Sequence, residues 1–312
     1  KYQPFKRVFP WYLLTGFILL SILFVNIFRQ KPMHKITRYS FNGLIFLGFL
    51  VHTLGLIVRW YISGRAPWSN GYESMIYVAW AAMLSGVIFG RKYPMVLGTA
   101  AILSGITLFV AHLNWMNPEI TPLVPVLKSY WLMIHVSIIT ASYGFLGLSA
   151  FLGILVLLLY AIMKKSNQKN VDHFIDQLTT ISELSATIGL YMLTIGTFLG
   201  GVWANESWGR YWGWDPKETW ALITAVIYAF IVHMRLIPSL RGRYNYNLAT
   251  VIAFASVLMT YFGVNYFLSG LHSYGKGTAD GIHWAVYASI GAIVVLAIWS
   301  YINYKKFEEI AE

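Results

Sequence analysis

The strongest constraint on this chain is a series of apolar runs, each close to twenty residues long. An α-helix needs about 20 mostly apolar residues to cross a hydrocarbon core about 30 Å thick. Only 11% of the 312 residues are charged, whereas about 25% is typical of a soluble domain. The sequence therefore predicts an all-α, polytopic membrane protein with about nine transmembrane helices. The runs cover residues 10–28, 41–62, 71–90, 95–113, 130–163, 185–203, 217–235, 247–268 and 283–303.

The positions of the lysines and arginines predict how these helices are oriented. If the linkers alternate between two sides, one side holds fourteen of the 23 Lys and Arg residues, namely Arg29, Lys31, Lys35, Arg38, Arg91, Lys92, Lys164, Lys165, Lys169, Arg235, Arg241, Arg243, Lys305 and Lys306. The positive-inside rule makes that side cytoplasmic. The N-terminus is then outside and the C-terminus cytoplasmic, although Lys1, Lys6 and Arg7 count against this. The net charge of +11 is thus explained by Lys and Arg residues on the predicted cytoplasmic side of the membrane, and it does not indicate nucleic-acid binding.

One predicted outer linker is unusually rich in tryptophan. The segment "WGRYWGWDPKETW", residues 208–220, holds four of the thirteen tryptophans. Tryptophans at membrane interfaces are usually scattered, so a cluster favours a platform for a large planar ligand. The charged part has a simpler reading, because "DPKE" is a typical helix start with Asp215 as the N-cap and Glu218 completing a capping box. The tryptophans of the cluster are Trp203, Trp208, Trp212, Trp214 and Trp220.

The histidines are the candidate metal ligands, since the chain has no cysteine. Helix counting places His135 and His272 on the same outer face as the tryptophan cluster. Two neutral imidazoles across a flat aromatic slot are a natural axial pair for haem iron, and Arg210 and Lys217 are nearby cations for the haem propionates. Zinc suits the pattern less well, because no Asp, Glu or Cys cluster supplies further ligands. For any single histidine, a helix-to-helix hydrogen bond is the alternative role.

The other histidines divide into one candidate and several without an argued role. His233 lies sixteen residues after Lys217, which places it about 24 Å deeper along the same helix, near the cytoplasmic side. We interpret His52 as a packed, hydrogen-bonded histidine first and a ligand second. His112, at the outer end of the fourth span, is also a weaker candidate.

Three motifs together resemble a known family. The tryptophan-rich segment resembles the WWD signature of haem-handling proteins in c-type cytochrome biogenesis. The segments "SNGYESMIYVAW" (69–80) and "GLHSYG" (270–275) look like the CcsA (ResC) branch of system II. The resemblance runs from about residue 41 to 303. The related CcmC and CcmF families share the tryptophan-rich segment but fit the other two motifs less well.

The resemblance implies a function and a set of partners. Proteins of this kind, together with a CcsB (ResB) half, transport haem b across the bacterial cytoplasmic membrane and act as a cytochrome c synthase of the haem lyase type. They attach the haem to the CxxCH segment of apocytochrome c. By resemblance, His135 and His272 ligate an external haem and His233 ligates a second one, whose other ligand comes from the CcsB half. Residues 1–40 would be the last span of a fused CcsB-like half, and residues 41–312 a haem-handling domain whose external tryptophan-rich loop lies at 203–220.

Two other classes of membrane protein remain as alternatives. A proton-coupled solute transporter would use the histidines as proton relays, but it would usually show broken helices in repeated halves. A bis-His b-type cytochrome that only transfers electrons would place its paired histidines within the spans. Here the best pair, His135 and His272, is predicted at the outer ends of helices.

Overall fold

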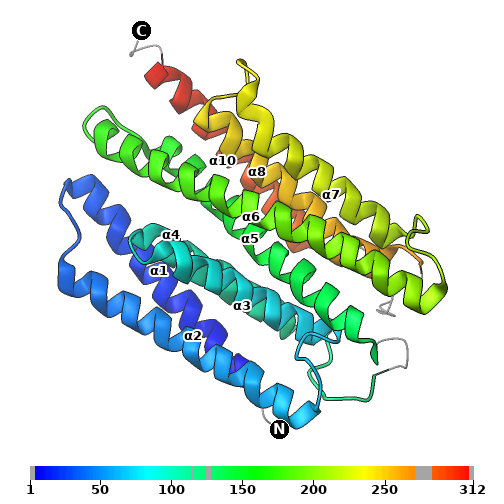
Figure 1. Ribbon diagram of the computed structural model, residues 1–312. Helices are drawn as coiled ribbons and strands as arrows, with labels where there is room; N and C mark the ends of the chain where they lie inside the picture. Colours follow the sequence, from blue (N-terminus) through cyan, green and yellow to red (C-terminus); the bar gives the residue numbers. More distant parts are fainter. Residues whose placement is uncertain (1–3, 114–115, 124–127, 271–282, 309–312) are drawn as a thin grey trace.

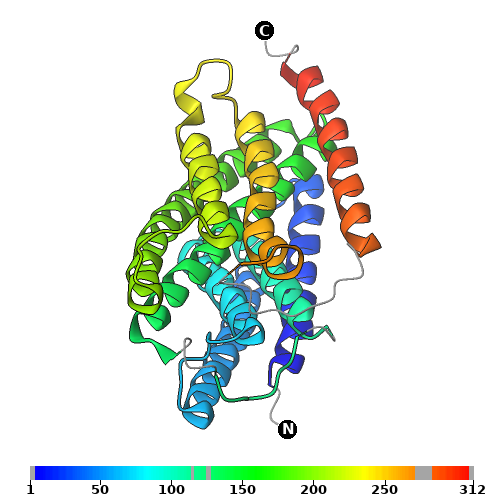
Figure 2. The same ribbon diagram turned by 90° about the vertical axis from the view of Figure 1, so that its right-hand side faces the viewer.

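The computed structural model describes residues 4–113, 116–123, 128–270 and 283–308. In this part of the chain nine helices are long and apolar enough to cross a membrane, which confirms the predicted polytopic helical fold. They form one bundle of roughly antiparallel neighbours (Figure 1, Figure 2). The helices are α1 (Phe5–Arg29), α2 (Lys35–Ser63), α3 (Gly71–Gly90), α4 (Pro94–Ala111), α5 (Tyr130–Ile162), α6 (Gln168–Trp208), α7 (Pro216–His233), α8 (Arg243–Leu258) and α10 (Trp284–Glu308).

The connections between helices alternate between the two ends of the bundle (Figure 1). One end carries the connections 64–70 and 112–129 and the loop at residues 209–215, which we call the Trp loop; this end is the Trp-loop end. The other end, the basic end, carries the connections 30–34, 91–93, 163–167 and 234–242. Helix α1 begins at the Trp-loop end and α10 ends at the basic end, as an odd number of crossings requires.

Helix α5 forms the centre of the bundle. It packs against α3, α4, α6, α8 and α10, and most of its side chains are buried. A β-carbon at Gly144 would lie 2.6 Å from the backbone nitrogen of Ala82, so glycine allows α5 and α3 to approach backbone to backbone. The central position of α5 means that a residue in its first turns faces several other helices at once.

Helix α6 is much longer than the apolar run at 185–203 predicted. It has 41 residues and begins at Gln168, so most of the polar stretch at 164–177, which lies between the predicted spans 130–163 and 185–203, is helical. The hydropathy pattern missed these turns because they carry Lys169, Asp172 and Asp176. No proline or glycine interrupts them, and their apolar side chains Val171 and Ile175 pack into the core.

The last span before the C-terminal helix is irregular at the Trp-loop end. Helix α8 continues into a π-helical segment, Met259–Gly263, and then into the short helix α9, Val264–Phe267. A π-helical turn widens the helix and is frequent at functional sites. Thr260 and Tyr261 in this segment line the cavity described next.

Candidate haem site

A cavity of about 390 Å³ lies inside the bundle at the Trp-loop end. Side chains from α3, α5, α6, α7 and the π-helical segment line it, together with residues of the Trp loop and of the connection between α4 and α5. Its lining is mainly apolar, with a few polar groups. Cofactor pockets in helical bundles have this composition and position.

His135 lies in the wall of this cavity and is held in a defined orientation. Its Nδ1 is 2.7 Å from the carbonyl oxygen of Gly196 on α6. A carbonyl oxygen only accepts hydrogen bonds, so Nδ1 carries the proton and Nε2 has the lone pair. Metal-binding histidines are typically oriented by such a bond from the second ring nitrogen. The imidazole also lies parallel to the indole of Trp203, with ring centroids 6.4 Å apart and an interplanar angle of 10°.

Aromatic side chains from separate parts of the chain form the other walls. Trp68 donates from Nε1 to the carbonyl oxygen of Met133 at 3.0 Å, and the hydroxyl of Tyr261 donates to the carbonyl oxygen of Gly71 at 2.9 Å. Tyr143 meets Tyr261 edge to face, with centroids 6.3 Å apart. These contacts fix the rings, so the cavity is a preformed aromatic slot.

Two charged residues at the start of α7 complete the lining. Lys217 donates from Nζ to Oδ1 of Asn265 at 3.1 Å, which directs its ammonium group into a mainly apolar cavity. Glu218 accepts from the backbone N–H groups of Gly213 and Asp215 at 2.7 and 3.2 Å, so its carboxylate shapes the Trp loop. The cavity therefore offers a cation suited to a carboxylate-bearing planar ligand.

Sequence comparisons identify the family. The profile of the cytochrome c assembly protein family matches residues 68–272, a range that contains the cavity-lining segments from Trp68 to Tyr266.

The chain belongs to the cytochrome c assembly protein family.

Three relatives show what this cytochrome c assembly protein is similar to. It is 37% identical to the cytochrome c biogenesis protein CcsA of Guillardia theta over 285 residues, covering 83% of this chain and 94% of the relative. It is also 37% identical to CcsA of Parasynechococcus marenigrum, covering 85% and 97%. It is 50% identical to protein NrfI of Wolinella succinogenes over 276 residues, but those span 88% of this chain and only 30% of NrfI. The protein is thus a CcsA-type multi-pass membrane protein with a role in c-type cytochrome maturation.

The structure sorts the site residues predicted for this assembly protein. His135, Trp212 and Lys217 line the cavity. Asp215 is buried and caps α7 in a complete capping box with Glu218. His272 lies outside the described residues, although Gly270, two residues earlier, packs against Asp215.

Trp203 and Tyr211 also line the cavity, whereas the other predicted residues of this region lie around it: Trp208, Arg210, Trp214 and Trp220. Trp208 packs edge to face on Trp203, with centroids 4.9 Å apart. Arg210 places its guanidinium directly over Gly213. Trp214 is 69% exposed and has a positive φ of 58°, and Trp220 contributes its carbonyl oxygen to a hydrogen bond from Thr260. The loop therefore presents one tryptophan, Trp212, to the cavity and others to its surroundings.

His233 lies at the basic end, far from this cavity. It is exposed on the surface of α7, and its Nδ1 is 2.7 Å from the carbonyl oxygen of Ala229. As for His135, this contact assigns the proton to Nδ1 and the lone pair to Nε2. Among the residues that the structure describes, no three His, Asp or Glu side chains converge on a metal site.

His52 and His112 differ from these two. His52 is fully buried, with Nε2 3.0 Å from the carbonyl oxygen of Ile76 and Nδ1 3.5 Å from the hydroxyl of Tyr12, so both nitrogens are engaged in packing contacts. His112 has its Nδ1 2.6 Å from the carbonyl oxygen of Leu108 and lines a separate cavity of about 360 Å³. Partial burial, together with the nearby Lys6, lowers the pKa of His112 below its usual 6.5.

Several lining residues were not singled out from the sequence. Trp68 precedes the "SNGYESM" motif directly, so its position beside that motif was an available signal. Tyr143, Tyr261 and Asn265 sit in otherwise apolar spans. Polar aromatic side chains in such spans are common, and only helix packing shows which of them face a cavity.

Proposed function

We propose that this protein binds haem b in the Trp-loop cavity and presents it to apocytochrome c. The observation that carries this proposal is the setting of His135. Its Nδ1–H donates a hydrogen bond to the carbonyl oxygen of Gly196, and its ring lies parallel to that of Trp203. The histidine lines a preformed aromatic slot that also has Lys217 in its wall. Neutral histidine, flat aromatic surface and a cation in the cavity wall are the groups that suit haem iron, porphyrin and propionate. His272 remains our proposal for the second axial ligand.

The proposed reaction is thioether formation at a CxxCH segment. Each cysteine S–H adds across one haem vinyl group: a carbon–sulfur bond forms, the vinyl π bond breaks, and the proton goes to the terminal vinyl carbon. Atoms and electrons balance without an added oxidant or reductant. The protein contributes by holding the haem and the peptide in register, which can supply about 7–11 kcal/mol of the barrier reduction when the geometry is close to that of reaction.

We further propose that haem reaches this cavity from the basic end by way of His233, with a CcsB half as the partner. The position of His233 on the exposed face of α7 supports a site completed by another protein. In the cytoplasmic membrane the basic end would face the cytoplasm, as the positive-inside rule predicts.

The direct test is the haem content of the protein purified with its CcsB half. A pyridine haemochrome spectrum identifies haem b, and low-spin bands in the visible spectrum indicate bis-histidine ligation. Folded protein from haem-replete cells that carries no haem would refute the proposal. A haem protein that transfers electrons but cannot mature a CxxCH-containing apocytochrome would instead be a b-type cytochrome.

A further inference from the structure

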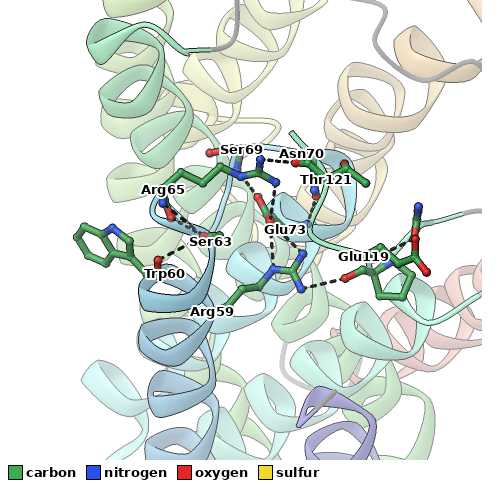
Figure 3. Close-up of polar contacts among 12 residues, drawn as sticks. Arg59, Trp60, Ser63, Arg65, Ser69, Asn70, Glu73, Glu119 and Thr121 are labelled. Atoms are coloured by element: carbon green, nitrogen blue, oxygen red, sulfur yellow. Dashed lines mark hydrogen bonds and ion pairs between the residues drawn. The ribbon is translucent and has the colours of Figure 1, made fainter. Parts of the chain in front are cut away.

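A buried carboxylate with two arginines lies next to the haem cavity. Glu73, in the first turn of α3, is 0% exposed. Its Oε1 accepts from Nε and Nη2 of Arg59 at 3.1 and 2.9 Å and from Nη2 of Arg65 at 3.4 Å. Figure 3 shows both guanidinium groups pointing toward Glu73 from the end of α2 and the turn that follows it. With one carboxylate and two guanidinium groups, the cluster has a net charge of +1.

One further guanidinium nitrogen of each arginine holds a segment that lines the cavity. This segment, residues 116–123, is called the strap. Nη1 of Arg59 donates to the carbonyl oxygen of Pro118 at 3.0 Å, and Nη1 of Arg65 donates to that of Thr121 at 2.5 Å. The strap residues that line the haem cavity are Met116, Pro122 and Leu123. The arginines therefore attach the strap to the bundle.

Glu73 also fixes the neighbouring cavity wall. Its Oε2 accepts from the backbone N–H of Ser69 at 3.1 Å, and Ser69 and Asn70 both line the cavity. The side chain of Asn70 in turn accepts from the backbone N–H of Glu73 at 2.8 Å, which caps α3. One carboxylate thus sets the position of the wall directly and of the strap through the arginines.

The charge balance of the cluster indicates what ligand would suit it. Hydrogen bonds from a guanidinium to a carboxylate are roughly twice as strong as those between neutral groups, and from the strap the two arginines engage only neutral carbonyl oxygens. The strap has a carboxylate of its own, Glu119, but in the part of the chain that the structure describes it forms no ion pair with either arginine. Glu73 neutralises one of the two arginines, so one positive charge is not balanced within the cluster. Nε of Arg65 is buried and has no hydrogen-bond partner. The cluster therefore has both the charge and a donor for one further carboxylate.

We propose that Arg59 and Arg65, held by Glu73, latch the strap over the haem cavity and exchange its carbonyl oxygens for a haem propionate. This inference rests on the proposed function. Haem carries two propionates, and Lys217 is a cation for one of them on the α7 side of the cavity. The arginine cluster on the α3 side takes the other, and its binding releases the strap, so that the vinyl edge becomes accessible only after haem is seated.

The test compares haem with haem dimethyl ester, which has the same porphyrin and iron but no carboxylate. Hydrogen–deuterium exchange of the strap amides is measured in the purified full-length protein without ligand, with haem and with the diester. Haem should speed exchange at residues 117–123 about tenfold over the diester, and haem should bind more tightly than the diester.

The key variant is Arg65→Gln, because it leaves the pair of Arg59 and Glu73 intact. A substitution of Glu73 would instead leave both arginines without a carboxylate. In the Arg65→Gln variant, haem and the diester should bind with equal affinity and give equal exchange rates of the strap amides. Without ligand, the strap amides should exchange faster than in the unmodified protein. Arg65→Lys keeps the charge and should be intermediate. Lys128→Gln removes one charge from an exposed position on the same connection and should behave as the unmodified protein.

The outcomes separate the two proposals. If the unmodified protein binds neither haem nor the diester through His135, the proposed function fails and this inference with it. If it binds both through His135 but strap exchange and affinity do not distinguish them, only the latch and its propionate are overturned. The same holds if Arg65→Gln and Lys128→Gln respond alike.

Discussion

A β-carbon at position 200 would lie 2.6 Å from Cε1 of His135, so the backbone of α6 passes directly against the imidazole ring. Together with the hydrogen bond to Gly196 one turn earlier, this contact fixes the histidine from two sides. The orientation of the candidate iron ligand in α5 is therefore set by α6.

The first prediction follows from this contact. Gly200→Ala should push the ring of His135 away and weaken haem binding about tenfold, since overpacking of this kind costs about 1–3 kcal/mol. Titration of the purified protein with haem measures the affinity. Gly43→Ala is the matched control, because a β-carbon at Gly43 meets nothing within 4 Å. Equal affinities for the two variants would show that the contact with α6 at position 200 does not hold the ring.

The second prediction concerns the axial ligands. His135→Ala, and likewise His272→Ala, should abolish cytochrome c maturation while the protein still inserts, because the iron loses a ligand. Added imidazole should restore the low-spin spectrum and part of the maturation. His173→Ala is the control, since His173 is exposed and contacts Gln177 within its own helix. Normal cytochrome c maturation in both variants would show that His135 and His272 are not the ligands of a haem at the Trp-loop end.

The third prediction separates the two ends of the bundle. His233 lies about 24 Å from Lys217 along α7, so haem that enters at the basic end must pass His233 first. His233→Ala should lower haem at both sites, whereas His135→Ala should lower it only at the Trp-loop end. Resonance Raman or EPR spectra, with haem content per protein, distinguish the sites. Undiminished haem at the Trp-loop end in His233→Ala, without external haem, would contradict this route.

The fourth prediction addresses the helix cap beneath the Trp loop. Asp215 accepts from the backbone N–H of Lys217 at 3.2 Å, so Asp215→Ala should destabilise the protein by about 1–2 kcal/mol and displace Lys217 from the cavity. Asp215→Asn keeps a good N-cap and serves as the control. Thermal unfolding in detergent measures the first effect and haem titration the second. If both variants unfold and bind haem alike, the cap contributes nothing to the site.

The fifth prediction uses the lowered pKa of His112. In the unfolded chain this histidine takes up a proton near pH 6.5, but in the folded protein it does so only at lower pH. Its contribution to stability is therefore full above about pH 6.5 and is lost as the pH falls toward the folded value. The free energy of unfolding should decrease more steeply below pH 6.5 in the unmodified protein than in His112→Gln. Parallel pH profiles would show that the pKa of His112 is not lowered.

The sequence by itself determined the number of spanning helices and much of their local structure. Apolar runs predict transmembrane helices because every backbone polar group must be satisfied within lipid, and nine such helices are present among the described residues. The capping box of Asp215 and Glu218 was equally readable, since its partners lie within four residues of one another. Hydropathy failed at the start of α6, where charged side chains and helical backbone occur together.

Only the tertiary structure decided which side chains share the cavity. His135 and Gly196 are 61 residues apart, and their contact depends on how α5 and α6 pack, which no local pattern encodes. The same packing selects Trp212 for the lining and leaves Trp214 exposed, although the two are only two residues apart in one motif. Glu73 lies in the first turn of a helix, but its two arginines and the strap come together only when α2, α3 and the connection before α5 meet. The sequence determines which chemical group each side chain carries, whereas the packing of distant helices determines which other groups it contacts.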